Sequence, residues 1–264
     1  MKLKFDMHVH TNLSSDSNMD LKDAVHAAKN KGLDGLFITN HDFVQDLQGY
    51  AEEEFYLISG CEYSTDAGHI LVYFIDEDIC KGLKRDKRGL LPWRETFDLA
   101  HKNGAIVFIA HPYAPYIKRD EEVYDMADGI EIYNARIVHS RVKQPNERAM
   151  NKAVLKNKAY SAGADAHFKN EIGAAYCEFD IDVSGKTHAQ ITEQLKSDLL
   201  NRNVVLYGGT ANPVYRPLSQ ILKSCKKKDL KMFLLAAPKL LRAFFKSFTS
   251  IKEPAIINIQ ESDT

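Results

Sequence analysis

The chain has 264 residues, of which 44% are hydrophobic and 27% are charged, and its formal net charge is −1. This composition excludes a disordered chain, and the sequence holds no apolar run of the roughly 20 residues that a membrane span requires. The four cysteines are far apart and form no CxxC pair, which favours free thiols over a disulfide framework. The first ten residues, MKLKFDMHVH, lack the apolar core of a secretory signal, so we expect a cytoplasmic protein.

Short β-rich runs alternate with helical patterns along the chain. The strands that we expect are residues 3–9, 35–39, 55–60, 69–75, 105–110, 129–134, 159–164, 174–181 and 203–208. The helices that we expect are residues 20–31, 93–103, 147–157 and 189–200. Asp20 is placed to cap the first helix and Gly32 to end it. This order predicts an α/β fold in which parallel strands are covered by helices.

The end of the chain differs from the rest in charge. Residues 213–246 contain nine lysines and arginines and a single acid, Asp229. The segment NPVYRP (212–217) is the best candidate boundary, which predicts a catalytic body over 1–212 and a basic amphipathic extension over 213–264. Pro238 is expected to interrupt any long helix there, so we expect two short helices.

Three interpretations of the basic extension remain open. In the first, its apolar side chains dock on the body and the lysines face water; these side chains are Phe233, Leu234, Leu240, Leu241 and Phe244. In the second, residues 222–248 make a peripheral contact with an anionic membrane surface. In the third, which has the least support, the lysines bind nucleic acid. The sequence predicts no oligomeric state.

Histidines and carboxylates gather where the expected strands end. The imidazoles are those of His8, His10, His41, His69, His111 and His167, and the carboxylates are those of Asp16, Glu62 and Asp165. In a parallel barrel the strand ends share one face, where sites are built. His-x-His on a strand also places both rings on one side. This set exceeds the needs of one tetrahedral ion and predicts two to three divalent ions, Mn, Zn or Fe. His26, His101 and His188 are interpreted as ordinary surface or satisfied core residues, and His139 is left undecided.

Six segments occur in an order that resembles a known family. They are FDMHVHTNLSSDS (5–17), GLDGLFITNHDF (32–43), GCEYSTDAGHILVYF (60–74), FIAHPY (108–113), GIEIYN (129–134) and SAGADAHF (161–168). Together they resemble the PHP (polymerase and histidinol phosphatase) domain of metal-dependent phosphoesterases. The resemblance implies a distorted seven-stranded β/α (TIM-like) barrel, here with a basic helical extension at the C-terminus. It also implies up to three metal ions in a cleft at the strand ends.

The resemblance further implies how the ligands are shared. His8, His10, Glu62 and Asp165 would hold one ion, and Glu62 would bridge to a second ion held by His69 and His111. Asp16, His41 and His167 would hold a third. Some family members have a histidine where this chain has Asp16, and a carboxylate there favours manganese or iron over zinc.

The predicted activity is hydrolysis of a phosphate ester by a metal-bridging hydroxide, with no protein nucleophile. The expected substrate is a small phosphorylated metabolite: a nucleotide, a nucleoside bisphosphate or a sugar phosphate. The alternatives are a nuclease acting on nucleic-acid ends, a histidinol-phosphatase-like enzyme and a metal-loaded binding module without turnover. Arg136 and Asn134 are candidate phosphate contacts, although Arg136 could form a surface salt bridge and Asn134 could brace its loop. His139 is a candidate proton donor to the leaving group.

Overall fold

A computed structural model describes residues 1–50, 54–115, 119–247 and 251–259. Its strands are β1 (Lys2–Val9), β2 (Gly35–Ile38), β3 (Tyr56–Thr65), β4 (Gly68–Tyr73), β5 (Ile106–Ile109), β6 (Gly129–Asn134), β7 (Ala159–Gly163), β8 (Ala175–Asp180), β9 (Val205–Gly208) and β10 (Ala255–Ile256). Nine of them match the expected strands in place, and the short β10 was not anticipated. The ten strands form one curled sheet in the order β10-β9-β8-β1-β2-β3-β4-β5-β6-β7.

The sheet is mixed rather than parallel. Strands β1 to β3 and β5 to β7 pair in parallel, whereas β4 runs antiparallel to both β3 and β5. The backbone of Ala166, just after β7, pairs with the end of β1, so the first and seventh strands meet. The number seven is nevertheless too low for the whole sheet, because β8, β9 and β10 extend it antiparallel beyond β1.

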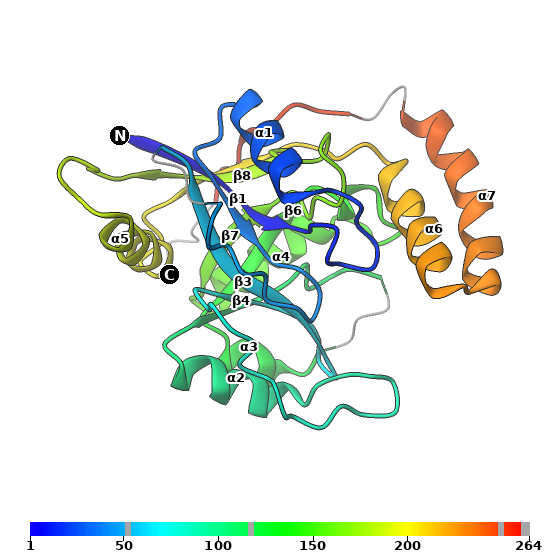
Figure 1. Ribbon diagram of the computed structural model, residues 1–264, viewed down its shortest axis with the longest axis horizontal. Coiled ribbons are helices and arrows are strands. Elements are labelled where there is room, and N and C mark those ends of the chain that lie inside the picture. Colours follow the sequence, from blue (N-terminus) through cyan, green and yellow to red (C-terminus); the bar gives the residue numbers. More distant parts are fainter. Residues whose placement is uncertain (51–53, 116–118, 248–250, 260–264) are drawn as a thin grey trace.

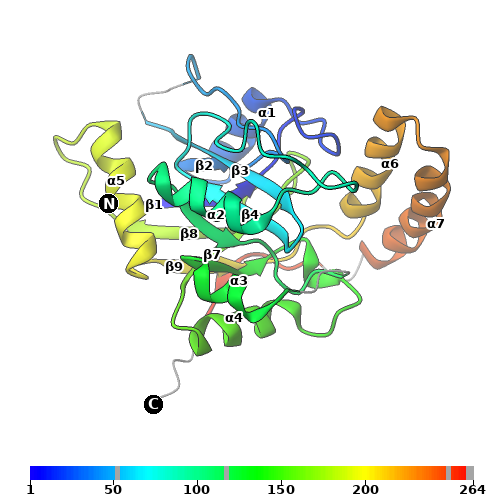
Figure 2. The same cartoon turned by 90° about the horizontal axis from the view of Figure 1, so that it is seen from below.

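Seven helices and one short 3₁₀ helix accompany the sheet in the described residues. They are α1 (Leu21–Asn30), α2 (Trp93–Lys102), α3 (Glu121–Met126), η1 (Ile137–His139), α4 (Pro145–Leu155), α5 (His188–Leu200), α6 (Tyr215–Lys227) and α7 (Leu230–Ser247). The side chain of Asp20 accepts a hydrogen bond from the Lys22 N–H and caps α1, as predicted. Helices α1 to α5 lie around the outside of the sheet, as Figures 1 and 2 show. None of the helices in the described ranges combines the length and the apolarity needed to cross a bilayer.

An aromatic core fills the curl of the sheet and holds the strand ends in place. Phe5 packs edge-to-face on Phe37 and on Phe179, with ring centroids 5.9 and 5.8 Å apart. Gly163 of β7 lets the β7 backbone pack directly against His8 of β1, because a Cβ at position 163 would lie only 2.5 Å from the Cβ of His8. The backbones of β1 and β7 therefore meet where the candidate ligands begin.

Helices α6 and α7 form an antiparallel pair, called here the hairpin (Tyr215–Ser247). It stands at the end of the molecule opposite α5 (Figure 1). The expectation that Pro238 separates two helices is wrong: α7 runs through Pro238, and the break falls at Lys228, whose φ is 54°. Pro238 removes the donor to the carbonyl of Leu234, a residue that is 61% exposed, so water can satisfy that carbonyl.

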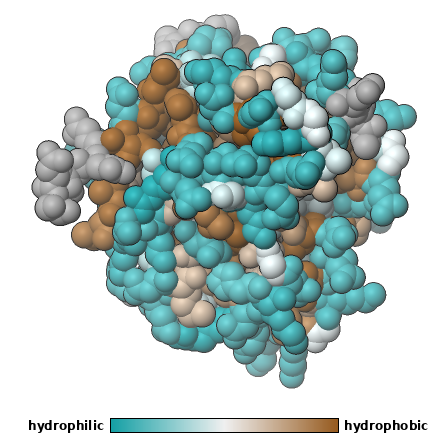
Figure 3. All heavy atoms as spheres, turned by 90° about the vertical axis from the view of Figure 1, so that its left-hand side faces the viewer, coloured by the Kyte–Doolittle hydropathy of each residue, from teal (hydrophilic) through white to brown (hydrophobic). Residues whose placement is uncertain are grey.

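The apolar side chains of α7 mostly face solvent. Leu234, Leu241 and Phe245 are 61%, 64% and 69% exposed. Phe233 and Phe244 are exposed as well, so the expectation that these side chains dock on the body is wrong, although Leu240 is partly buried. The face around α5, at the other end of the molecule, is mostly hydrophilic (Figure 3). After α7 the chain returns to the sheet as β10, which pairs with β9.

Candidate metal centre

The structure brings the predicted ligands together in one group, called here the Glu62 cluster: His8, His10, Asp16, His41, Glu62, His69, His111, Asp165 and His167. The Glu62 carboxylate lies at its centre, in the middle of β3 rather than after it. One of its oxygens, Oε1, lies 2.8 Å from His69 Nδ1 and 2.9 Å from His111 Nε2. The other oxygen, Oε2, lies 3.2 Å from the Nε2 atoms of both His8 and His10 and 3.0 Å from His41 Nδ1. Burial opposes ionisation of Glu62, but the histidines, His41 first, hold the pKa of this carboxyl well below its usual range. A fully buried, ionised carboxylate with five imidazoles around it has the chemistry of a ligand shared between cations.

The antiparallel course of β4 explains how His69 joins this group. His69 stands at the start of β4, and the start of an antiparallel strand lies at the same edge of the sheet as the ends of its neighbours. The structure therefore places His69 beside the other candidate ligands at one end of the strands, although β4 is antiparallel and not parallel as expected.

Asp165 lies between His10 and His8 and links the end of β7 to β1. Its Oδ1 lies 3.4 Å from His10 Nε2 and 3.8 Å from His8 Nε2. Asp165 has φ of 57° and His111 has φ of 26°, which is an uncommon backbone conformation for residues other than glycine. Two candidate ligands thus sit on strained backbone, as is common at functional sites.

Asp16, His41 and His167 form a second part of the cluster, nearer the solvent. Asp16 Oδ1 lies 3.4 Å from His167 Nε2, and Asp16 Oδ2 lies 3.6 Å from His41 Nε2. Lys223 of α6 also reaches Asp16 Oδ2, at 3.0 Å. Burial, reinforced by the charge of Arg136, lowers the pKa of His167 to about 3, so this ring is neutral and able to bind a cation near pH 7.

A second layer of buried side chains orients the ligands. Glu131 of β6 accepts a hydrogen bond from His8 Nδ1 at 2.8 Å and one from the backbone N–H of His111 at 2.7 Å. Sequence reasoning missed Glu131, although a glutamate between Ile130 and Ile132 in an apolar strand was the available signal. A carboxylate on the second nitrogen of a ligand histidine fixes its tautomer and its orientation.

The three residues expected to act on substrate differ in how they relate to the cluster. Asn134 Nδ2 lies 3.4 Å from Asp165 Oδ2, and Arg136 Nη1 lies 2.9 Å from His167 Nδ1, so both contact proposed ligands. Asn134 is fully buried, and its Oδ1 accepts from the backbone N–H groups of Arg136 and Ile137, which fits a brace of the loop. Arg136 is nearly buried and donates to Glu171 Oε1, to the carbonyl of Tyr215 and to Ser219 Oγ. The surface salt bridge considered for Arg136 is thus a buried one, and Glu171 is a further residue that sequence reasoning missed.

His139 lies in η1 and lines a neighbouring cavity instead of joining the cluster. Asp6 does not touch a ligand side chain. Its oxygens accept from the backbone N–H groups of His8, Ala164 and Gly173, and burial raises the pKa of Asp6 to about 7. Asp6 therefore positions the backbone at the end of β1 and β7.

The donor set fits divalent ions. Four triads of candidate ligands each bring one atom per residue within 4.8 Å of the others; they are His8–His10–Asp165, His8–Glu62–His111, His41–Glu62–His69 and His10–His41–His167. His10 Nε2 is buried and makes no hydrogen bond, although the carboxylate oxygens of Glu62 and Asp165 lie 3.2 and 3.4 Å away. An orphaned buried nitrogen is costly unless something else binds it, and a cation would do so.

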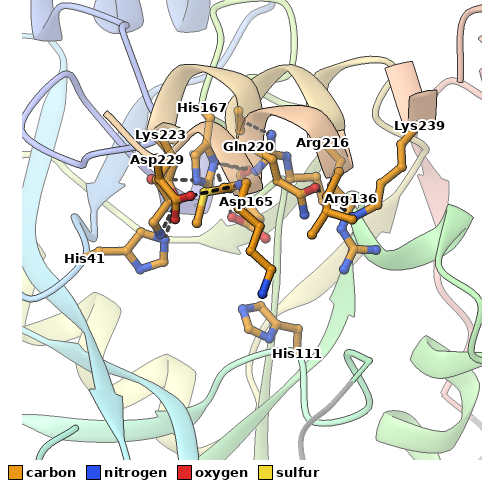
Figure 4. A pocket seen from close by; sticks show the side chains of 15 residues that line it. His41, His111, Arg136, Asp165, His167, Arg216, Gln220, Lys223, Asp229 and Lys239 are labelled. Carbon is orange, nitrogen blue, oxygen red and sulfur yellow. Dashed lines mark hydrogen bonds and ion pairs between the residues drawn. The ribbon is translucent and has the colours of Figure 1, made fainter. Parts of the chain in front are cut away.

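The cluster opens into a cavity of about 530 Å³, called here the metal pocket. Its floor carries Asp16, His41, His111, Asp165 and His167, and its opposite wall is made by the hairpin. Figure 4 shows Arg136, Arg216 and Lys239 together on one side of this pocket, away from His41. The pocket therefore combines a site for cations with a neighbouring group of fixed positive charges.

Comparison with known proteins gives two family matches in sequence. Residues 6–131 match the PHP domain, and residues 143–198 match a PHP-associated segment. The chain is 30% identical to the uncharacterized protein MJ1587 of Methanocaldococcus jannaschii over 176 residues, which are 60% of this chain and 96% of that protein.

Two solved structures share the fold. PsfC from Pseudomonas syringae has a TM-score of 0.61 and 18% identity, over 85% of this chain and 98% of that chain. The lesion-specific endonuclease PfuEndoQ from Pyrococcus furiosus has a TM-score of 0.50 and 16% identity, over 76% of this chain and 56% of that chain. At these identities the likeness is one of fold.

Proposed function

This chain belongs to the PHP domain family of metal-dependent phosphoesterases, and we propose that it hydrolyses the phosphate ester of a small phosphorylated metabolite at the Glu62 cluster. The observation that supports the proposal most is the buried Glu62 carboxylate within 3.2 Å of five histidine nitrogens. We propose the nine predicted ligands as the metal site: His8, His10, Asp16, His41, Glu62, His69, His111, Asp165 and His167.

Bound divalent ions would supply a water of lowered pKa and would neutralise charge on the phosphate oxygens. The protein's own part is to hold the ligands in register and to aim the substrate. Glu131 fixes the ring of His8, and Asn134 holds the loop that carries Arg136. Burial, with the charge of Arg136, lowers the pKa of His167 and keeps its ring neutral, and Arg136 also lines the pocket where the phosphate would lie. His139 remains our candidate for proton transfer to the leaving group, from the neighbouring cavity.

The test is phosphate release from a panel of nucleotides, nucleoside bisphosphates and sugar phosphates by the full chain with added manganese. His10→Ala and Asp165→Ala should each lower turnover more than about 100-fold, because each removes a direct ligand. His26→Ala is the matched control, since His26 is exposed on α1 and belongs to none of the candidate ligand groups found in the described residues. Full activity of either ligand variant would overturn the assignment, provided that circular dichroism shows both folded.

The second candidate is a nuclease acting on nucleic-acid ends, and the positive charges of the hairpin beside the metal pocket favour it. The same preparation should then cleave a single-stranded oligonucleotide and release no phosphate from the small substrates. Cleavage that falls steeply with salt would support this candidate, because phosphate contacts release counterions.

We further propose that α7 makes a peripheral contact with anionic membranes, as part of a basic extension that is distinct from the catalytic body. Helix α7 contains no acid, and its exposed leucines and phenylalanines lie beside cationic residues. Helices of this kind lie in the headgroup region of anionic membranes.

Flotation with phosphatidylserine vesicles tests the membrane contact. Leu241→Glu should abolish binding, whereas Leu155→Glu on α4, at a leucine that is 76% exposed, should leave it intact. Equal flotation of both variants, or no flotation of the unaltered chain, would contradict the contact.

A further inference from the structure

A second cavity, of about 320 Å³, adjoins the metal pocket and is called here the hairpin cavity. Four segments and Pro115 line it: the segment that carries η1, the chain between β9 and α6, the start of α6, and the second half of α7. Its volume lies within the range of small-molecule sites. The mechanism proposed above uses His139 and Arg136 of this lining and gives no role to the cations that the hairpin adds.

The charge of the hairpin cavity is one-sided. Six arginines and lysines line it, namely Arg136, Arg141, Arg216, Lys239, Arg242 and Lys246, and no aspartate or glutamate is among the described residues that do so. Arg136 is paired with Glu171 behind the lining, so the excess of positive charge comes from Arg141 and the hairpin. Cations gathered around a concave surface repel one another and create a positive potential, which attracts anions. Arginine also presents a fork of donors that matches phosphate oxygens. We propose that the hairpin cavity is an anion-binding site for a phosphate group.

This site lies beside the metal pocket. Arg136, Arg216, Gln220 and Lys239 line both cavities, and the proposed occupant reaches from one to the other past these four residues. If the proposed phosphoesterase activity holds, on which this step rests, the substrate carries two phosphate groups. One is the ester hydrolysed at the Glu62 cluster, and the other is held in the hairpin cavity and is not cleaved there.

Anchors at both ends of α6 hold the cavity in a fixed place. Near its start, the Arg136 guanidinium donates to the carbonyl of Tyr215 at 3.0 Å and to Ser219 Oγ. Near its end, Lys226 Nζ donates to the carbonyl of Ser17 at 2.7 Å, and Lys223 pairs with Asp16. Because the hairpin is tied to the loop that carries a proposed ligand, the distance between the two anion positions is set before substrate binds.

The two matched family ranges end at residue 198, before the hairpin begins. The anion site is therefore built by an element outside those ranges. A site of this kind adjusts specificity without changing the ligands of the cluster.

The test compares substrates that differ only by a second phosphate. We would measure kcat/KM of the manganese-loaded full chain for a nucleoside 3′,5′-bisphosphate and its 5′-monophosphate, and for a sugar bisphosphate and its monophosphate. At least one bisphosphate should be preferred by about 10- to 100-fold, the range expected for charge-assisted hydrogen bonds. Arg141→Gln combined with Arg242→Gln should remove most of that preference.

The matched control is Lys227→Gln combined with Lys228→Gln, which removes the same charge from exposed positions of the same hairpin outside both cavities. It should keep the preference. No preference in the unaltered chain, or equal losses in both double variants, would overturn the anion site. Cleavage of an oligonucleotide that depends on Arg141 and Arg242 would overturn the small bisphosphate as the occupant.

Calorimetric titration of a bisphosphate separates this inference from the proposed function. If no compound is hydrolysed, the proposed function fails, and the titration still decides the site. Weaker binding in the Arg141/Arg242 variant than in the Lys227/Lys228 variant would support the anion site, and equal binding would refute it.

Discussion

The Glu62 cluster and the hairpin are built in opposite ways. The cluster takes its side chains from strand ends spread over residues 8–167, buries them and pairs each charge with another. The hairpin is one continuous segment, the cations that it brings to its cavity are mostly exposed, and none of the described residues that line this cavity is an acid. The chemistry thus depends on the whole sheet, whereas the recognition of substrate depends on a local addition. A change in the cluster should alter turnover, and a change in the hairpin should alter substrate preference.

Glu62→Gln should break the cluster most severely. The amide keeps the shape of the side chain but removes the charge that five histidine nitrogens surround. We expect turnover to fall by more than about 100-fold, since losing even an outer partner of a metal site costs about 10- to 100-fold. Steady-state phosphate release with added manganese measures this. A variant that keeps a tenth of the activity would show that Glu62 is not a shared ligand.

Glu131→Gln should have the next largest effect, because it acts on the cluster from outside. His8 Nδ1 loses a charged acceptor at 2.8 Å, and we expect metal affinity to fall by about 10- to 100-fold. Metal titration that monitors recovered activity gives this value. A normal kcat at saturating manganese would identify Glu131 as a positioning residue, whereas a kcat that stays low at saturation would indicate a direct role in catalysis.

Lys223→Gln tests the point where the two regions touch. It removes the cation that lies 3.0 Å from Asp16, one of the proposed ligands, and leaves the sheet unchanged. The pair is partly exposed, so we expect a change of less than about 1 kcal/mol in stability and a change of a few-fold in KM. Thermal unfolding and initial rates measure both. A loss as large as that of Glu62→Gln would mean that the hairpin supplies part of the catalytic machinery.

Phe245→Ser should have the smallest effect on the folded chain in water. The Phe245 side chain is 69% exposed, and substitutions at such positions change the free energy of unfolding by less than about 0.5 kcal/mol. Urea unfolding measures this, with the buried Phe108→Ser as the contrasting variant, which should cost several kcal/mol. A large loss of stability in Phe245→Ser would show that this face of α7 is covered in solution.

Much of the sheet could be predicted because its pattern is local. Short β-rich runs predicted nine of the ten strands, and the histidines that follow or begin these runs predicted the cluster. The direction of β4 could not be predicted, because an isolated strand has the same pattern in either direction. The two-residue β10 has no pattern of its own and exists only through its pairing with β9.

The outer layer of the site was harder to predict than the ligands. Glu131 and Glu171 contact the cluster through His8 and Arg136, and such contacts depend on tertiary packing that spacing alone does not reveal. Arg136 was identified from its place after a strand, but its buried ties to Tyr215 and Ser219 join segments about 80 residues apart. The prediction of a helix break at Pro238 was wrong for a related reason. A proline interrupts a helix less when water can reach the carbonyl four residues earlier, which here is the carbonyl of Leu234, and the sequence does not show whether that carbonyl is exposed.

The return of the chain to the sheet makes the hairpin an insertion between two neighbouring strands. Ala255 of β10 stands opposite Gly208 of β9, and the N–H of Thr210 donates to the carbonyl of Lys252 at 2.9 Å. The chain thus leaves and re-enters the sheet at one point, where a short turn could join the two strands directly. An exchange of the chain between β9 and β10 would therefore alter one wall of the metal pocket and leave every proposed metal ligand in place.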